Sequence, residues 1–408
     1  MIIGGGIAGV TATETIRARD HEGSIALISG ESLPLYSRVM LPSYVRGRLN
    51  RERVFLRSVA DYEAKGVALF LGNEVVGINL ERREVHTNIG KIFSYKTLLI
   101  STGGVPARWH VEGGDHPLAY RLQTMEDADR LREILQKSSE QNARLPGRQA
   151  LVIGCGFIGL EFIESYIAYG MRPFIIMPED YAFARFVGPE GGRLLEEQWQ
   201  QRGAEIMRRT TIEALRFSEG GIVALTTEGQ GYRGVFAGVG IGLERNISVF
   251  TGIGLEVKKS IMVNEFLETN QKGVFAAGDA AEYFDVIFQK HRLTGNWTNA
   301  YLQGSIAGEN MTRYAHGEQH DYRAFRNVSS YSITHMGMHL AFLGECEKNT
   351  RFADESRRAA RVEERFIPER RAYQQLFFEG SRLMGASLIN HPKDIPAFLA
   401  RIEQGQKI

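Results

Sequence analysis

The sequence has few of the residues that define several classes of protein. Only two cysteines, Cys155 and Cys346, occur in 408 residues, which excludes a disulfide framework and a zinc site built from paired C-x-x-C motifs. The formal net charge is +1, so no long-range field would gather nucleic acid or an anionic membrane. No apolar run approaches the roughly 18 to 20 residues that span a bilayer, and the first residues lack signal-peptide features. We therefore expect a cytoplasmic protein that binds neither nucleic acid nor membrane and holds no metal.

The residues that are abundant indicate an ordinary globular protein with glycines at chosen places. Hydrophobic side chains make up 43% of the chain and charged ones 24%. At roughly 150 residues per domain, the length predicts two or three domains. The 45 glycines exceed the usual share of about 7%, and they gather next to apolar runs instead of forming low-complexity tracts.

Two copies of one motif lie about 150 residues apart. MIIGGGIAGVTATETIRA opens the chain, and ALVIGCGFIGLEFIESYIAYG follows from residue 150. Each predicts a buried strand, a G-x-G-x-x-G turn and an amphipathic helix, and a second strand follows at residues 25–29 and 174–177. Such glycines allow a tight turn, a close approach of backbone to a pyrophosphate and close helix packing, and the helix N-terminus favours phosphate. Two copies predict two dinucleotide sites.

An acidic residue about 20 positions after such a turn can hold a ribose 2′-hydroxyl. Glu31 follows Gly9 by 22 residues, and Glu179 follows Gly159 by 20 in a looser fit. A solvated loop acid is the alternative at both positions. Only three residues precede Gly4, which makes the first strand short, and a start upstream of Met1 stays open.

Further strands and a third unit follow from the remaining pattern. KTLLISTGG (96–104) and GVFAAGDAAE (273–282) each read as a buried strand that runs into glycine, and the second places Asp279 after its strand. A polar helix from about residue 126 leads to a turn, LPGRQ (145–149), which indicates a domain boundary. Near the C-terminus we expect short strands at 331–334, 339–344 and 373–378, an Arg-rich loop between them and a closing helix near Pro396.

With both glycine motifs, LLISTGG and VFAAGD in this order, the chain resembles the pyridine nucleotide–disulfide oxidoreductase superfamily over nearly its whole length. The resemblance implies an α/β protein with two Rossmann-like domains and a small α+β C-terminal domain. The FAD-binding domain would be discontinuous, formed by residues 1–110 and 240–318. Residues 111–239 would bind NAD(P)H, and residues 319–408 would form the C-terminal domain.

The resemblance also implies which residues hold the two cofactors. Those for FAD would be Gly4, Gly6, Ile7, Ala8, Gly9, Glu31, Arg38, Val75, Thr102, Gly103, Asp279 and Trp297. Those for the nicotinamide nucleotide would be Gly154, Gly156, Ile158, Gly159, Glu161, Glu179 and Gly240. Glu161 matches the family's I-G-x-E position near the nicotinamide, and Trp297 would lie near the isoalloxazine ring. A surface ion pair for Arg38, a core role for Trp297 and a stabilising helix acid for Glu161 are the alternatives.

The choice between NADH and NADPH rests on the end of the second strand in the inserted domain. NADH-using relatives have Glu there, and this chain has Met177. No basic pair follows that strand to hold a 2′-phosphate, so we expect NADH ahead of NADPH. Cys155 stands at a variable position of the motif and reads as a small buried filler, as does Cys346.

The segment PLYSRVMLPSYVRG (34–47) indicates the electron acceptor. Relatives that use a thiol carry a redox cysteine where this chain has Val39, and a valine forms no thiolate or sulfenate. Tyr36, Arg38 and Leu41 instead reproduce the segment of relatives without this cysteine. These are the NADH:rubredoxin and ferredoxin reductases and the amino-terminal part of the NADH-dependent nitrite reductase large subunit.

We therefore expect an FAD-dependent NAD(P)H oxidoreductase whose flavin carries the chemistry and whose partner is a rubredoxin-like or ferredoxin-like carrier or another redox subunit. An NADH oxidase that reduces oxygen at the flavin and a non-catalytic flavin- or nucleotide-sensing subunit are the alternatives. A homo-oligomer is compatible with the sequence. The Arg-rich loop could dock an acidic carrier, but interleaved acids make a solvated face equally compatible; its arginines are Arg357, Arg358, Arg361, Arg365, Arg370 and Arg371.

Overall fold

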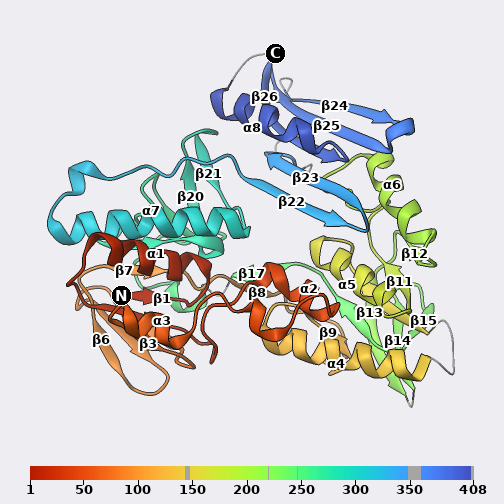
Figure 1. The fold of residues 1–408 in the computed structure, drawn as a ribbon, viewed down its shortest axis with the longest axis horizontal. Helices are drawn as coiled ribbons and strands as arrows, with labels where there is room; N and C mark the ends of the chain where they lie inside the picture. Colours follow the sequence, from red (N-terminus) through yellow and green to blue (C-terminus); the bar gives the residue numbers. More distant parts are fainter. Residues whose placement is uncertain (143–147, 219, 246, 348–359, 406–408) are drawn as a thin grey trace. The chain divides into compact units, whose positions relative to one another are not determined.

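A computed structural model describes residues 1–142, 148–218, 220–245, 247–347 and 360–405. The chain forms two compact units (Figure 1). Unit 1 contains residues 1–39, 51–105 and 244–329, and unit 2 contains residues 40–50, 106–243 and 330–408. The domain boundaries expected from the sequence stay a prediction. Most of the expected turn at 145–149 lies outside the described residues.

Unit 1 is built on a five-stranded parallel sheet. Its strands, in spatial order, are β19 (Val274–Ala276), β7 (Leu98–Ile100), β1 (Ile2–Ile3), β2 (Ile25–Ile28) and β3 (Val67–Phe70). They are short and almost wholly apolar, as expected for parallel strands that are covered on both faces. The strand that leads into the first glycine turn, β1, and the strand before Asp279, β19, therefore end at the same edge of one sheet.

Two helices far apart in the sequence pack closely in unit 1, α1 (Ile7–Arg19) and α7 (Trp297–His316) (Figure 1). A Cβ added at Gly304 would lie 2.2 Å from the carbonyl oxygen of Ala8, and one at Gly308 would lie 2.7 Å from that of Ala12. Only glycine fits at these two positions of α7. This close packing fixes the helix that starts at the first glycine turn.

The remainder of unit 1 consists of small sheets and short helices. One antiparallel sheet contains β4 (Val75–Asn79), β5 (Glu84–Thr87) and β6 (Ile92–Ser94). A second sheet contains β18 (Ile261–Val263), β20 (Ala281–Asp285) and β21 (Lys290–Arg292). Helix α3 (Val59–Ala64) begins with a capping box in which Ser58 and Asp61 bond each other's backbone N–H.

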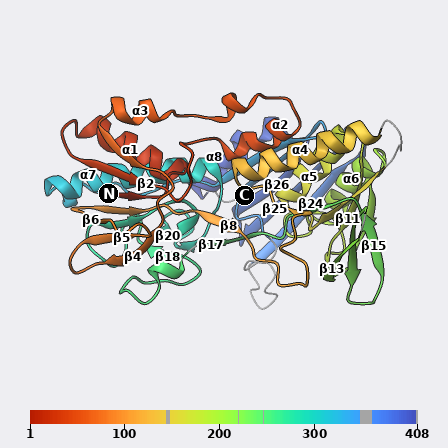
Figure 2. The same cartoon turned by 90° about the horizontal axis from the view of Figure 1, so that it is seen from below.

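Unit 2 repeats the parallel-sheet plan. Its strands, in spatial order, are β12 (Glu205–Met207), β11 (Arg172–Ile176), β10 (Gln149–Ile153), β16 (Ala237–Val239) and β9 (Ala119–Tyr120). Before its C-terminal part, this unit contains the helices α2 (Leu41–Val45), α4 (Met125–Asn142), α5 (Phe157–Ala168) and α6 (Pro189–Gln200). Helices α2 and α4 lie side by side in both views (Figure 2). A three-stranded antiparallel sheet contains β13 (Ile212–Ser218), β14 (Gly221–Thr226) and β15 (Gly231–Gly234).

The C-terminal part of unit 2 is a five-stranded antiparallel sheet with a closing helix. Its strands are β22 (Ser330–His335), β23 (Met338–Gly344), β26 (Arg382–Ile389), β25 (Ala372–Glu379) and β24 (Ala360–Ile367). Helix α8 (Ile395–Gln404) begins beside Pro396, as expected. At the join between the two units in sequence, β8 (Gly104–Pro106) pairs with β17 (Leu243–Arg245).

The prediction of an Arg-rich loop was wrong for its central residues. Residues 360–367 form β24, which pairs along its length with β25, so Arg361 and Arg365 lie on a strand. Arg370 ends a 3₁₀ turn, and Arg371 follows it. Arg357 and Arg358 lie outside the described residues. The charged pattern concealed an edge strand, because edge strands commonly carry charged side chains.

The predicted α/β class is confirmed, with a parallel sheet and a glycine turn in each unit. The predicted strands of both glycine motifs and the polar helix after residue 125 are also present. None of the described helices is long and apolar enough to cross a membrane.

Candidate functional site

The first glycine turn follows β1 in unit 1 and is closely packed against its own backbone. Gly4 has a positive φ of 108°, and a Cβ there would lie 2.2 Å from the carbonyl oxygen of Ser101. A Cβ at Gly9 would lie 2.0 Å from the carbonyl oxygen of Gly4. Protein packing alone therefore requires glycine at the first and third positions of the motif.

The middle glycine is different, because the chain itself leaves its side open. Apart from its neighbours along the chain, no atom of the described residues lies within 4 Å of a Cβ added at Gly6, and this residue is the N-cap of α1 without a side-chain cap. The first N–H groups of a helix have no acceptor within it and carry a partial positive charge. An open backbone beside a bare helix N-terminus fits a phosphate group. Ile7 is partly buried and Ala8 buried in this first turn of α1.

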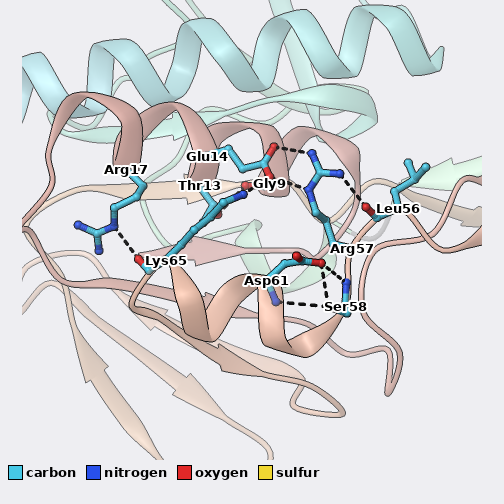
Figure 3. A network of polar contacts seen from close by, with 9 residues as sticks. All are labelled: Gly9, Thr13, Glu14, Arg17, Leu56, Arg57, Ser58, Asp61 and Lys65. Atoms are coloured by element: carbon cyan, nitrogen blue, oxygen red, sulfur yellow. Dashed lines mark hydrogen bonds and ion pairs between the residues drawn. The ribbon is translucent and has the colours of Figure 1, made fainter.

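A polar network lies further along α1 (Figure 3). Thr13 Oγ1 donates to the carbonyl oxygen of Gly9 at 2.8 Å. Glu14 accepts hydrogen bonds from Arg57 Nε at 2.7 Å and from Lys65 Nζ at 2.6 Å. Burial raises the pKa of Glu14, and the two cations outweigh it and lower that pKa. The network joins α1 to the segment around α3.

The acid expected at the end of β2 is held by the aromatic segment that follows. Glu31 accepts a hydrogen bond from the hydroxyl of Tyr36 and one from Arg38 Nη2 at 2.5 Å. Arg38 Nη1 also donates to the Tyr36 hydroxyl at 2.8 Å. The side chains of Glu31 and Arg38 are 38% and 34% exposed, so each is open to a ligand. The structure thus brings together two residues that the sequence assigned to FAD separately.

Two polar side chains, those of Thr102 and Asp279, have no hydrogen-bond partner among the residues that the structure describes. The hydroxyl of Thr102, after β7, is buried and no described residue bonds it, and Gly103 next to it has a φ of 68°. Asp279 lies in a 3₁₀ turn after β19, and no hydrogen bond to its carboxylate is found among the described residues. Burial raises the pKa of Asp279, although Arg245 and Arg38 oppose the change. Both groups fit a polar ligand, as FAD would be.

The other residues expected at FAD lie at two further places. Trp297 is the first residue of α7, is partly buried and follows the N-cap Asn296, whose side chain accepts from Asn299 N. Val75 begins β4 and packs, partly buried, against the core of unit 1. Val75 thus packs within unit 1, and its expected contact with FAD stays a prediction.

The second glycine turn, in unit 2, repeats the geometry of the first. Gly154 has a φ of 88°, and its Cβ would lie 2.5 Å from the carbonyl oxygen of Gly240, which follows β16. A Cβ at Gly159 would lie 2.4 Å from the carbonyl oxygen of Gly154. Gly156 is the bare N-cap of α5, and its Cβ direction is again open. Ile158 lies partly buried in the first turn of α5.

Glu161, three residues after Ile158 on α5, forms an ion pair that the sequence did not reveal. Arg46 Nη1 donates to Glu161 Oε2 at 2.6 Å, and the two side chains are 7% and 14% exposed. Arg46 is the C-cap of α2 and belongs to the aromatic segment 34–47. The only available signal was an arginine in a segment already singled out, with no indication of its partner.

The end of β11, where an adenosine ribose would be recognised, carries charges of both signs. Met177 is buried, whereas Glu179 is exposed. Arg209 donates its backbone N–H to the carbonyl oxygen of Glu179, and its side chain pairs with Asp180 at 2.5 Å. Arg209 follows β12, so the sequence pattern near Met177 could not reveal it. The parallel pairing of β11 with β12 brings these residues together.

Neither cysteine is placed for redox chemistry. Cys155 and Cys346 are both buried, and neither forms a disulfide within the part of the chain that the structure describes. Burial raises the pKa of the Cys155 thiol, and the charges of Glu179 and Glu196 raise it further. A thiol that stays protonated is a poor nucleophile. Val39, the residue at the position expected for a redox cysteine, is 63% exposed and lies at the surface of unit 1.

The sequence model described as "Pyridine nucleotide-disulphide oxidoreductase" matches residues 1–304. The chain belongs to this family. The family binds FAD and includes oxidoreductases that use NADH.

Several curated proteins are similar in sequence. Monodehydroascorbate reductase 4 of Arabidopsis thaliana is 28% identical over 315 residues, which cover 72% of this chain and 62% of that protein. The anthranilate 1,2-dioxygenase system ferredoxin–NAD(+) reductase component of Burkholderia cepacia is 28% identical, with 76% and 75% covered. The rubredoxin-NAD(+) reductase of Pseudomonas putida is 25% identical, with 76% and 79% covered. The match spans only 50% of apoptosis-inducing factor 3 of Mus musculus. The chain thus spans between half and two thirds of the length of some of its relatives.

Solved structures share the fold. The putidaredoxin reductase chain of a covalent complex with putidaredoxin superposes with a TM-score of 0.87. The comparison covers 100% of this chain and 93% of that one at 22% identity. This likeness confirms the predicted fold with two Rossmann-like domains.

Proposed function

We propose that the chain is an FAD-dependent NAD(P)H oxidoreductase that passes electrons to a small rubredoxin-like or ferredoxin-like protein without a redox-active cysteine. FAD, when bound, accepts a hydride and releases electrons one at a time. The polypeptide binds and orients the two nucleotides. Residues 1–110 and 240–318 are proposed as the FAD domain, 111–239 as the NAD(P)H domain and 319–408 as the C-terminal domain.

Two open glycines support the assignment of two nucleotide sites. Gly6 and Gly156 each leave free space at a bare helix N-terminus, while the glycines on either side are required by packing. On the FAD side we assign the pyrophosphate to the turn at residues 4–9 and the ribose to Glu31 with Arg38. Thr102, Gly103, Asp279 and Trp297 complete this proposed site. In unit 2 we assign NAD(P)H to the turn at residues 154–159 with Glu161 and Glu179.

The proposed electron acceptor rests mainly on where the chain has cysteine thiols and where it has none. The outward-facing position expected for a redox cysteine is Val39, and both thiols of the chain are buried. Electrons therefore cannot leave through a surface dithiol, which disfavours a disulfide as acceptor. Relatives named as ferredoxin and rubredoxin reductases support a protein carrier instead. A cytoplasmic location, which suits an NADH-linked carrier system, belongs to this proposal.

Anaerobic reduction of the purified protein tests the proposal. We expect a yellow protein whose flavin absorption near 450 nm is bleached by NADH and restored by added rubredoxin or ferredoxin. Titration with NADH and NADPH measures the nucleotide preference, with NADH expected ahead.

Three outcomes would overturn it. Failure to bind FAD or to be bleached by either nucleotide would favour a sensing subunit. Restoration by air alone, with no response to carriers, would favour an oxidase. Restoration by a low-molecular-weight disulfide would contradict the thiol-free route.

A further inference from the structure

A buried polar chain behind Glu161 has no place in the function proposed above. His335 is 1% exposed at the end of β22, and its Nδ1 lies 3.3 Å from Glu164 Oε2 on α5. Trp199 on α6, which is fully buried, donates its Nε1–H to His335 Nε2 at 2.8 Å. These three residues come from three elements of unit 2. A buried histidine with two such partners is held in one orientation.

The chain of contacts fixes the position of the imidazole proton. The indole N–H of tryptophan can only donate, so His335 Nε2 must be the unprotonated, accepting nitrogen. The proton then lies on Nδ1, which faces the carboxylate of Glu164. Trp199 thus selects the tautomer that donates to Glu164.

Glu164 in turn holds two arginines of residues 40–50. Arg48 Nη2 donates to its Oε1 at 3.0 Å, and Arg46 Nε lies 3.9 Å from the same oxygen. Arg46 Nε has no hydrogen-bond partner among the described residues, so ionic attraction to Glu164 and the bond to Glu161 hold its guanidinium. Glu161 and Glu164 lie three residues apart on α5, and Arg46 lies between their carboxylates.

We propose that His335 is a positioning residue for the nicotinamide site, since through Glu164 it holds Arg46 against Glu161 and so neutralises the carboxylate there. The inference rests on the proposed function, because it places the nicotinamide ring near Glu161. The nicotinamide ring is neutral in NADH and cationic in NAD⁺. An unpaired carboxylate would attract the oxidised product, whereas the Glu161–Arg46 pair lets the site favour NADH. The contacts from Trp199 through His335 and Glu164 to Arg46 therefore help the site to distinguish NADH from NAD⁺.

His335→Ala is the first test, with the FAD-loaded protein and equilibrium titrations of NADH and NAD⁺ under anaerobic conditions. Without the bond to His335, Glu164 draws Arg46 away from Glu161. We expect the affinity for NAD⁺ relative to NADH to rise at least fivefold. The double variant His335→Ala/Glu161→Gln should return that ratio to within about twofold of Glu161→Gln alone.

Two further variants separate positioning from ordinary stabilisation. His335→Asn retains an N–H donor near the Nδ1 position and should keep the wild-type ratio within about twofold. Tyr373→Phe removes a buried hydroxyl that accepts from Gly188 N at 2.7 Å elsewhere in unit 2, and it should leave the ratio unchanged even if it lowers stability. An unchanged ratio in His335→Ala, or an equal change in Tyr373→Phe, would overturn the inference.

Nitrogen NMR of labelled histidine tests the hydrogen bonds of His335 to Trp199 and Glu164 without relying on activity. We expect the Nδ1–H tautomer for His335 in the wild type and a mixture of tautomers in Trp199→Phe. A wild-type Nε2–H tautomer would overturn the inference even if NADH reduces the flavin. Absence of nucleotide binding by the wild type would overturn the proposed function and this inference with it, while the tautomer result would still report on the chain.

Discussion

Glu14 and Glu164 occupy the same place in the two nucleotide motifs, each ten residues after the first glycine of its turn. Their surroundings differ. Glu14 is 28% exposed, and its partners Arg57 and Lys65 are 38% and 39% exposed (Figure 3). Glu164 is 10% exposed and faces His335, which is 1% exposed.

The two strand–turn–helix motifs share a backbone path, but the glutamates at the same place on their helices have different charged partners and different exposure. The glycine turns agree in φ and in close contacts, because the same strand-turn-helix path imposes the same steric limits. The helix face beyond each turn is free to vary. In unit 1 this helix face carries the partly exposed ion pairs of Glu14 with Arg57 and Lys65. In unit 2 it carries a buried network of polar side chains that ends at Glu161.

Removal of the two carboxylates should give the largest difference. Glu164→Ala leaves buried Arg46 and His335 without their shared partner and should lower the free energy of unfolding by about 3–5 kcal/mol. Glu14→Ala is the matched control and should lower it by about 1 kcal/mol or less, since its network is largely solvated. Urea unfolding followed by circular dichroism measures both. Equal losses would remove the distinction between the two networks.

Lowering the pH should remove the stabilisation that the buried carboxylate of Glu164 provides. Burial raises the pKa of Glu164, but the His335 hydrogen bond and the charges of Arg46 and Arg48 lower it from 4.5 to about 2. A lowered pKa stabilises the folded state above pH 4.5, and this contribution is lost as the pH falls toward 2. It amounts to about 3 kcal/mol. The difference in unfolding free energy between wild type and Glu164→Gln should therefore shrink between pH 5 and 2; a constant difference would contradict the assignment.

The third glycines should be equally intolerant in both turns. Gly9→Ala places a Cβ 2.0 Å from the carbonyl oxygen of Gly4, and Gly159→Ala places one 2.4 Å from that of Gly154. We expect each to lower the unfolding free energy of the cofactor-free protein by about 2–3 kcal/mol. Chemical denaturation tests this. A large loss in only one variant would show that the two turns are not sterically equivalent.

The middle glycines should separate the two cofactors, with the smallest effect on free energy. The Cβ that Gly6→Ala or Gly156→Ala adds meets no atom of the described residues within 4 Å, chain neighbours aside, so both variants should fold normally. Gly6→Ala should weaken FAD binding roughly tenfold, or about 1.4 kcal/mol, and leave the apparent affinity for NADH intact. Gly156→Ala should do the reverse. Flavin fluorescence and NADH titration measure the two affinities, and loss of both ligands in one variant would contradict the division.

Much of the fold followed from local pattern. The two glycine motifs predicted strand, turn and helix because only glycine permits the backbone contacts at Gly4 and Gly154. Apolar runs before Thr102 and Asp279 correctly indicated buried strands. Strand β24 was missed because arginines and glutamates interspersed along an edge strand are typical of a solvated loop.

The candidate site was less accessible, because side-chain partners depend on tertiary contacts. Nothing in the sequence links Arg46 to Glu161, 115 positions away, or Trp199 to His335, 136 positions away. The same holds for Arg209, which reaches the end of β11 only through the pairing of β11 with β12. Residue type and spacing could mark the nucleotide turns but could not show what surrounds them.

The close packing of α7 on α1 has a consequence for synthesis of the chain. The first glycine turn leaves the ribosome early, but α7 and the edge strand β19 that complete its unit start only at residues 297 and 274. At typical elongation rates the interval is roughly 14–55 s. Nascent chains therefore carry the first glycine turn without α7 and β19 while the intervening segment emerges, and the helix pair α1–α7 can form only after residue 316 has been added.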